Sequence, residues 1–145
     1  MTKRQGGFLI ARIHQLSGRV FARKLTYHGL GEINPAQGRI LFVLWQEDNL
    51  TMGELSKRTS LSKSTLTSML DRLEASGHVS RVAVSEDRRL VLVRLADASS
   101  GLRARYEAVS EEMVKDFYAG LSTAQIDQFE MTLSHILQNL SDLEQ

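Results

Sequence analysis

The chain has 145 residues and 42% apolar composition, enough for one domain with a real hydrophobic core. It contains no cysteine, which excludes disulfides, cysteine-ligated metal sites and thiol nucleophiles. The net charge of +1 hides an uneven distribution, because residues 1–33 carry +5 and residues 97–145 carry −6. A basic front and an acidic rear suit a polyanionic partner on one side only.

The longest early apolar run covers residues 8–13 and is interrupted by Arg12. A bilayer span needs roughly 20 apolar residues, and a secretory core needs a less broken run. No lipidation motif is visible in the sequence. We therefore expect no membrane association and a cytoplasmic location.

A first helix is predicted over about residues 8–28, where Leu9, Ile13, Leu16 and Val20 recur at helical spacing. We expect this stripe to be buried. Two glycines within residues 28–31 end the helix, because glycine adopts positive φ easily.

A second helix is predicted from Asn34-Pro35 to about Glu47, since asparagine caps a helix start and proline suits its first position. Residues 40–45 are apolar nearly all round, so this helix should lie at the centre of the molecule. Gly38 within it indicates either close packing or a cavity.

Two short helices joined by a tight turn are predicted between Leu50 and Gly77. Thr51 caps the first helix, residues 59–61 make the turn, and Ser62 caps the second helix. The inward face of the second helix consists of its large apolar side chains, Leu66, Met69, Leu70 and Leu73.

From residue 78 to residue 95 the periodicity changes to two, which predicts a β-hairpin with a polar tip at residues 85–88. Two helices follow it. The last helix repeats apolar residues at three-four spacing, a pattern typical of lengthwise packing on another helix. Its members are Ile126, Phe129, Leu133, Ile136, Leu140 and Leu143. We therefore expect a partner surface on this helix.

The helix capped by Ser62 has a small, polar outward face. At 100° per residue this face carries Ser64, Thr67, Ser68 and Asp71. Hydroxyl side chains can bond phosphates or base edges, and lysine and arginine reach phosphate or guanine. The alternative is a solvated surface, but the order helix, turn, helix, hairpin favours DNA contact. The candidate DNA-binding residues here are Ser62, Lys63, Ser64, Thr65, Thr67, Ser68 and Arg72.

The hairpin tip supplies a second candidate contact through Asp87, Arg88 and Arg89. Arginine is favoured in a narrow minor groove by its negative potential, and an acid nearby can orient the guanidinium. The alternative is a solvated tip with a weak ion pair. We favour DNA contact by Arg88 or Arg89, with Asp87 supporting the wing.

The segment Leu50 to Leu95 resembles the DNA-binding region of the MarR family of regulators, most closely in ELSKRTSLSKSTLTSMLDRLEASG and in EDRR followed by an alternating strand. The resemblance implies an obligate homodimer formed by the first and the last two helices. It implies recognition helices in successive major grooves of a pseudo-palindromic operator, and wings in the minor grooves. Asp87 and Arg89 match the family's wing motif, and repression is the commoner behaviour of the family.

The expected fold is mainly α with a small β-hairpin wing (α+β). It consists of a winged helix-turn-helix over residues 34–96 and dimerisation helices over residues 1–33 and 97–145. The expected partners are double-stranded DNA and a second copy of the chain, and many family members also bind a phenolic or aromatic effector. The alternatives are a constitutive regulator without a ligand and a winged-helix protein-interaction module.

An effector pocket is a further hypothesis, with His14 of the first helix facing Phe42 and Trp45 of the second. The competing interpretation, which the sequence favours, makes Phe42 and Trp45 core residues and leaves His14 exposed. The four histidines lie in no metal-ligand spacing, and the sequence carries no catalytic motif in a plausible context. We therefore expect no metal, no cofactor and no enzymatic activity.

Overall fold

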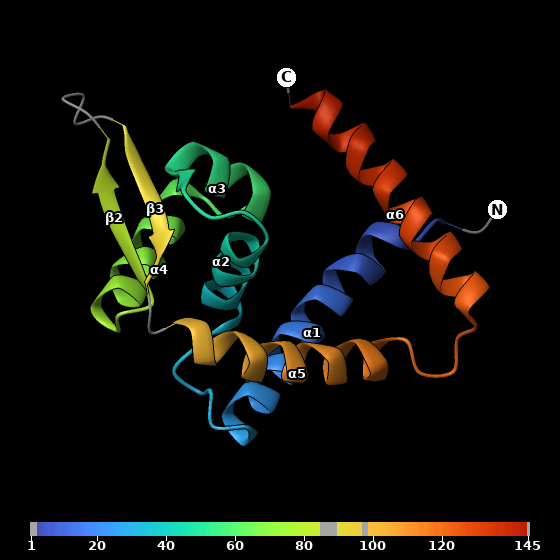
Figure 1. The fold of residues 1–145 in the computed structure, drawn as a ribbon. Coiled ribbons are helices and arrows are strands. Elements are labelled where there is room, and N and C mark those ends of the chain that lie inside the picture. The colour runs from blue at the N-terminus through green and yellow to red at the C-terminus, as the bar shows by residue number, and fades with distance from the viewer. Residues whose placement is uncertain (1–2, 85–89, 97–98, 145) are drawn as a thin grey trace. The chain divides into compact units, whose positions relative to one another are not determined.

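The computed structural model of the chain describes residues 3–84, 90–96 and 99–144. It contains two compact units, Met1–Glu111 and Glu112–Gln145, and their boundary falls within one helix. The elements, in chain order, are α1 (Gly6–Tyr27), α2 (Pro35–Gln46), β1 (Leu50–Thr51), α3 (Met52–Thr59), α4 (Lys63–Ala75), β2 (Val79–Ala83), β3 (Val91–Leu95), α5 (Ser99–Phe117) and α6 (Thr123–Leu143). The predicted mainly helical fold with a small β-sheet is confirmed (Figure 1).

The helix starts lie where the sequence places them, because capping side chains bond the free amides of the first turn. Asn34 Oδ1 accepts from the Gln37 amide at 2.8 Å, and Gln37 Oε1 accepts from the Asn34 amide at 2.8 Å. Thr51 and Glu54 form the same reciprocal pair at 3.1 Å, which lowers the pKa of Glu54. Ser62 caps α4 as predicted.

The sheet has three strands in the order β1-β3-β2, one more than the predicted hairpin. β2 and β3 pair antiparallel, with Arg81 opposite Val93. β1 adds to the other edge of β3, placing Leu50 opposite Val93. A two-residue strand is too short to show a period of two, so the sequence pattern could not reveal it.

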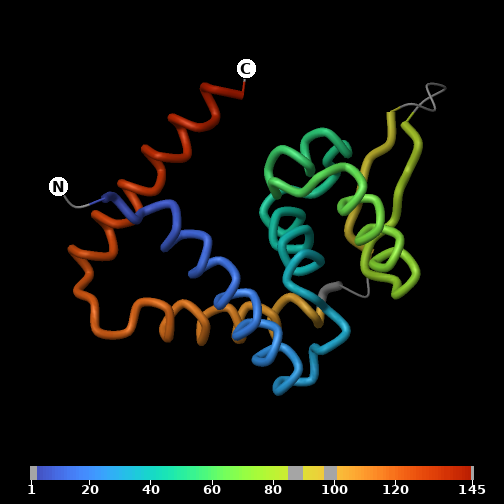
Figure 2. Tube along the Cα trace, turned by 180° about the vertical axis from the view of Figure 1, so that it is seen from behind, coloured from blue at the N-terminus to red at the C-terminus, as the bar shows by residue number. Residues whose placement is uncertain are grey.

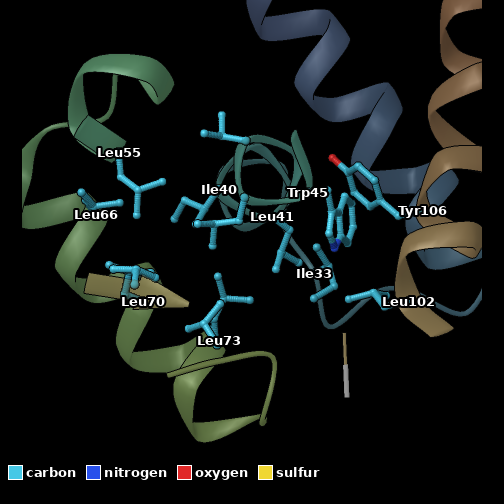
Figure 3. Packing of buried hydrophobic residues seen from close by; sticks show 14 of the residues in the cluster. Ile33, Ile40, Leu41, Trp45, Leu55, Leu66, Leu70, Leu73, Leu102 and Tyr106 are labelled. Atoms are coloured by element: carbon cyan, nitrogen blue, oxygen red, sulfur yellow. The ribbon is translucent and has the colours of Figure 1, made fainter. Parts of the chain in front are cut away.

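Helix α2 lies at the centre of the first unit, as predicted. Ile40 and Leu41 are fully buried. Figure 3 shows leucines of α3 and α4 on one side of α2 and Trp45 with Tyr106 of α5 on the other. Phe42 departs from the expected all-round burial, since it is 48% exposed. The helix is therefore the hub that joins the α3–α4 pair to α5.

Gly38 is a site of close packing and not a cavity. A Cβ atom added to Gly38 would lie 2.7 Å from ring carbons of Tyr106, well inside van der Waals contact. The Tyr106 ring also packs on Trp45 and Phe21, with centroids 5.4 Å and 5.6 Å away. Burial raises the pKa of Tyr106 to about 12. Glycine at position 38 therefore makes room for this aromatic ring.

The stripe of the first helix is exposed within the single chain, contrary to the prediction that it is buried. Leu9, Ile13 and Leu16 are between 41% and 48% exposed, and Leu25 is the buried residue of α1. Residues 6–16 of α1 are all exposed, and burial begins only in the C-terminal part of the helix. The prediction assumed that the chain itself covers the stripe.

The second unit consists of the last residues of α5 and the whole of α6, and α6 has no buried side chain. Tyr118 donates to a Glu130 carboxylate oxygen at 2.6 Å and packs edge-on against Phe129 at 6.2 Å between ring centroids. Leu140 and Leu143 of the predicted apolar series are 58% and 80% exposed. The three-four series of α6 is thus partly covered at Ile126, Phe129 and Leu133 and open to solvent from Ile136 to Leu143.

Gly38→Ala is expected to destabilise the fold by about 1–3 kcal/mol, because the added methyl group overpacks the core against Tyr106. Urea unfolding measures the effect. Gly53→Ala is the matched control, since its Cβ would meet only Thr51 Oγ1 at 3.9 Å. An unchanged unfolding midpoint for Gly38→Ala would contradict the close packing.

Candidate nucleic-acid interface

The turn between α3 and α4 is fixed by bonds from several elements. Ser60 ends α3 in the left-handed region, with φ of 59°. Arg39 Nη1 of α2 donates to the carbonyl oxygen of Thr59 at 2.9 Å, and Ser56 Oγ donates to that of Leu61 at 2.8 Å. These bonds set the direction in which α4 leaves the turn.

Helix α4 is held by its apolar face. Leu66, Leu70 and Leu73 are fully buried, and Met69 is partly buried and accepts from Asn34 Nδ2 at 3.3 Å. In both views α4 lies against the β2–β3 hairpin (Figure 1 and Figure 2). The predicted inward face of this helix is confirmed.

The opposite face of α4 is open to solvent along its length. Ser64, Thr67, Ser68 and Asp71 are all exposed, as the helical projection predicts. The long basic side chains at its two ends, Lys63 and Arg72, are exposed as well, and Thr65 is half-buried. No side chain larger than threonine stands on this face before Asp71.

The Ser62 side chain is already engaged in hydrogen bonds at the start of α4. Its Oγ accepts from the Thr65 amide at 3.3 Å and donates to Thr65 Oγ1 at 3.0 Å. The hydroxyl thus works as a cap, which keeps the helix start in a fixed conformation. The other backbone amides of the first turn and the positive end of the helix dipole can still bind a phosphate at this end of α4.

An ion-pair cluster joins α4 to the first strand of the hairpin, and the sequence reasoning missed it. Arg81 of β2 donates from Nη2 to Asp71 Oδ1 at 2.6 Å and from Nε to Glu74 Oε2 at 3.1 Å. Hydrogen bonding to Arg81 holds the pKa of Glu74 below its ordinary value. In the sequence, this cluster was indicated only by two acids three residues apart, Asp71 and Glu74, followed by Arg81 on the next predicted strand.

The wing residues Asp87, Arg88 and Arg89 lie outside the described residues. The described part of the hairpin ends at a backbone bond from the Val84 amide to the Leu90 carbonyl oxygen, at 3.0 Å. The assignment of Arg88 and Arg89 to DNA contact therefore stays a prediction.

The three candidate effector residues lie in different environments. His14 of α1 is exposed, Phe42 of α2 is 48% exposed, and Trp45 is buried against Tyr106. Trp45 Nε1 has no hydrogen-bond partner within the described part of the chain. Trp45 is thus a core residue with an unused donor, and a pocket made by all three residues stays a prediction.

Within residues 3–84, 90–96 and 99–144, no group of three or more acidic or histidine side chains could hold a metal ion. None of the helices in these ranges combines the length and the apolar character that crossing a membrane requires.

The sequence of the DNA-binding region is similar to those of known transcription regulators. The MarR family model matches residues 33–91, which cover the helix-turn-helix and strand β2 and end at the first residue of β3. The chain is 38% identical over 92 residues to the HTH-type transcriptional regulator TtmR of Methylorubrum extorquens (strain PA1). The match covers 63% of this chain and 46% of TtmR, so it spans less than half of that relative.

Solved structures share the fold of this chain over nearly its whole length. A variant of MarR from E. coli complexed with operator DNA is 27% identical, with a TM-score of 0.79 and coverage of 90% of this chain and 92% of that one. Bordetella bronchiseptica BpsR, whose DNA binding is regulated by 6-hydroxynicotinic acid, shares the fold at 22% identity and a TM-score of 0.79. That likeness covers 98% of this chain and 96% of BpsR. Residues 33–91 of this chain therefore match the MarR family, and the chain shares the fold of solved MarR regulators over nearly its whole length.

Proposed function

We propose that the chain is a dimeric, sequence-specific DNA-binding transcription regulator that acts as a repressor. The observation that carries the proposal is the exposed hydroxyl face of α4, formed by Ser64, Thr67 and Ser68. A helix with small side chains can enter the major groove of B-DNA closely enough for hydroxyl groups to reach base edges. The proposal assigns the protein no catalytic step, and a regulator of chromosomal genes works in the cytoplasm.

The basic residues of α4 position the helix in this proposal. Lys63 and Arg72 stand at its two ends and reach phosphates on both sides of the groove, or a guanine edge. The amides of the first turn, ordered by the Ser62 cap, add an anion-binding end. Thr65 lies beside them at the groove edge. These contacts fix the register, and Thr67 and Ser68 read the sequence.

The wing completes the binding unit. We assign Arg88 or Arg89 to the adjacent minor groove, with Asp87 orienting the guanidinium. Strand β2 packs against α4 and pairs with β3, which supports this assignment. The neighbouring groove lies within reach of such a hairpin.

The exposed apolar faces of α1 and α6 support dimerisation. Leu16 of α1 and Leu140 of α6 are 46% and 58% exposed, and each belongs to a continuous stripe. Apolar stripes of this length are uncommon on monomers and mark interfaces. We propose that residues 1–33 and 97–145 pair with a second copy, which sets two α4 helices on half-sites about 10 base pairs apart.

Repression is the simplest consequence of such binding, because a dimer that occupies a promoter excludes other proteins from it. A small aromatic effector is the second part of this proposal. The regulation of BpsR by 6-hydroxynicotinic acid supports it as a precedent within the fold. His14, Phe42 and Trp45 are the residues we would test first. A constitutive regulator shares every DNA-binding feature, and a ligand screen separates the two.

A protein-interaction module on the same fold is the rival from another class. Cores of protein interfaces are enriched in aromatic residues, methionine and arginine, and are depleted in serine. The exposed face of α4 has the opposite composition before Asp71, with Ser64, Thr67 and Ser68. This composition favours contact with a DNA groove over contact with a protein partner.

Thr67→Ala or Ser68→Ala is expected to change the preference among operator variants by about 1 kcal/mol or more, because a base edge loses its bonding partner. Competition binding with single-base operator variants measures it. Ser134→Ala on α6 is the control with an exposed hydroxyl elsewhere. Equal losses on every sequence would make Thr67 and Ser68 backbone contacts instead.

Arg89→Ala is expected to weaken binding to many sequences and to flatten the plot of log K against log salt by about one unit. Anisotropy titrations at several salt concentrations give the slope. Arg103→Ala removes an arginine that pairs with Glu107 on α5, and it should keep the slope. The wing assignment fails if Arg89→Ala changes neither slope nor affinity.

Leu140→Glu is expected to weaken the dimer by about 100-fold or more, because an unpaired charge would be buried at the interface. Analytical ultracentrifugation would show species near the 16.3 kDa monomer, with operator affinity falling in parallel. Ser134→Glu places the same charge on an exposed position of α6 that lies off the apolar stripe, and it should leave the dimer intact. A wild-type chain that sediments as a monomer would refute the dimer.

A further inference from the structure

Arg81 links the recognition helix to the wing by both its side chain and its backbone. Glu74 Oε2 accepts from Arg81 Nε at 3.1 Å and from the Arg81 backbone amide at 3.2 Å. Arg81 Nη2 donates to Asp71 Oδ1 at 2.6 Å and lies 3.4 Å from Glu74 Oε1. One strand residue thus bonds two acids that are almost one helical turn apart on α4.

The geometry of this cluster is stiff. Guanidinium donors lie in one plane, so several bonds made at once fix the orientation of the group as well as its distance. The Arg81 side chain is 27% exposed, less than its partners Asp71 at 60% and Glu74 at 43%. Arg81 also pairs in register with Val93 of β3, which is fully buried. The linkage therefore runs from α4 through β2 into the core-anchored strand of the wing.

The charges of the cluster have a second consequence at the proposed DNA face. Asp71 belongs to the exposed face that carries Thr67 and Ser68, and a carboxylate there repels phosphates. Arg81 offsets this negative charge, and hydrogen bonding to Glu74 and then Asp71 raises the pKa of Arg81. The cluster therefore keeps two acids next to DNA without leaving them unpaired.

We propose that Arg81 is a positioning residue that holds the wing at a fixed angle to α4, so that helix and wing enter adjacent grooves as one unit. This inference rests on the proposed function, since it names the element that coordinates the two DNA contacts. The rival is that apolar packing of Val79 and Val93 alone fixes the wing. In that case the Arg81 ion pairs contribute little, as exposed ion pairs commonly do.

The first test needs no DNA. The chain has no cysteine, so spin labels can be placed at Ser64→Cys in α4 and Ala83→Cys in β2, both exposed positions. With labelled chains diluted in unlabelled chains, the distance distribution between the labels should broaden in Arg81→Met and in Asp71→Asn/Glu74→Gln. Arg103→Met removes an ion pair within α5 and should keep the narrow distribution. Unchanged widths in both cluster variants would overturn the proposal.

The second test measures the consequence for binding. Arg89→Ala should cost at least about threefold less affinity in the Arg81→Met background than in the Arg103→Met background, because a loosely held wing has already lost its groove contact. A loss of overall stability, followed by thermal unfolding, would not produce this coupling. Equal costs in the two backgrounds would contradict the positioning role.

The double acid variant distinguishes the positioning role of Arg81 from two other roles, charge compensation and a purely structural link. Asp71→Asn/Glu74→Gln should weaken operator binding as Arg81→Met does, because it breaks the same linkage. Tighter binding by the acid variant would instead make Arg81 a charge compensator, and the proposal would be overturned. If the wild-type chain binds no duplex while the label distances still broaden in Arg81→Met, the proposed function fails and the assignment of Arg81 to DNA positioning fails with it. Arg81 would then have only a structural role, as a link between α4 and β2.

Discussion

The burial of one face of α4 is the constraint on which the rest of the structure depends. Leu66, Leu70 and Leu73 are fully removed from solvent. Each such side chain contributes about 1.5–3 kcal/mol through the hydrophobic effect. Because these three positions fix the rotation of the helix about its axis, they also fix which residues face outward. The exposed face with Thr67 and Ser68 is thus a direct result of core packing.

The remaining elements set where this helix stands. The left-handed Ser60 and the bond from Arg39 to the turn determine how α4 leaves α3. Helix α2 joins these parts to α5, with Gly38 leaving room for the Tyr106 ring. Arg81 ties the hairpin to the opposite end of α4. The turn contacts hold the start of α4, and the Arg81 ion pairs hold its end.

Features governed by neighbours in sequence could be predicted, and features governed by distant residues could not. The caps at Asn34, Thr51 and Ser62 and the two faces of α4 depend on residues within a turn or two. The strand β1 and the Arg81 cluster depend on contacts that no local pattern encodes. The exposure of the α1 stripe was mispredicted for a related reason: periodicity shows that a face is apolar, but not which surface covers it. For the site, the hydroxyl face was predicted and its attachment to the wing was not.

The most direct test of the account is the selection of DNA duplexes by the full chain from a random pool, followed by affinity measurements at several salt concentrations. The account predicts enrichment of two related half-sites about 10 base pairs apart, with affinity that falls steeply as salt rises. Selection of no sequence, together with no salt-sensitive affinity for any duplex, would contradict the claim that α4 enters a groove.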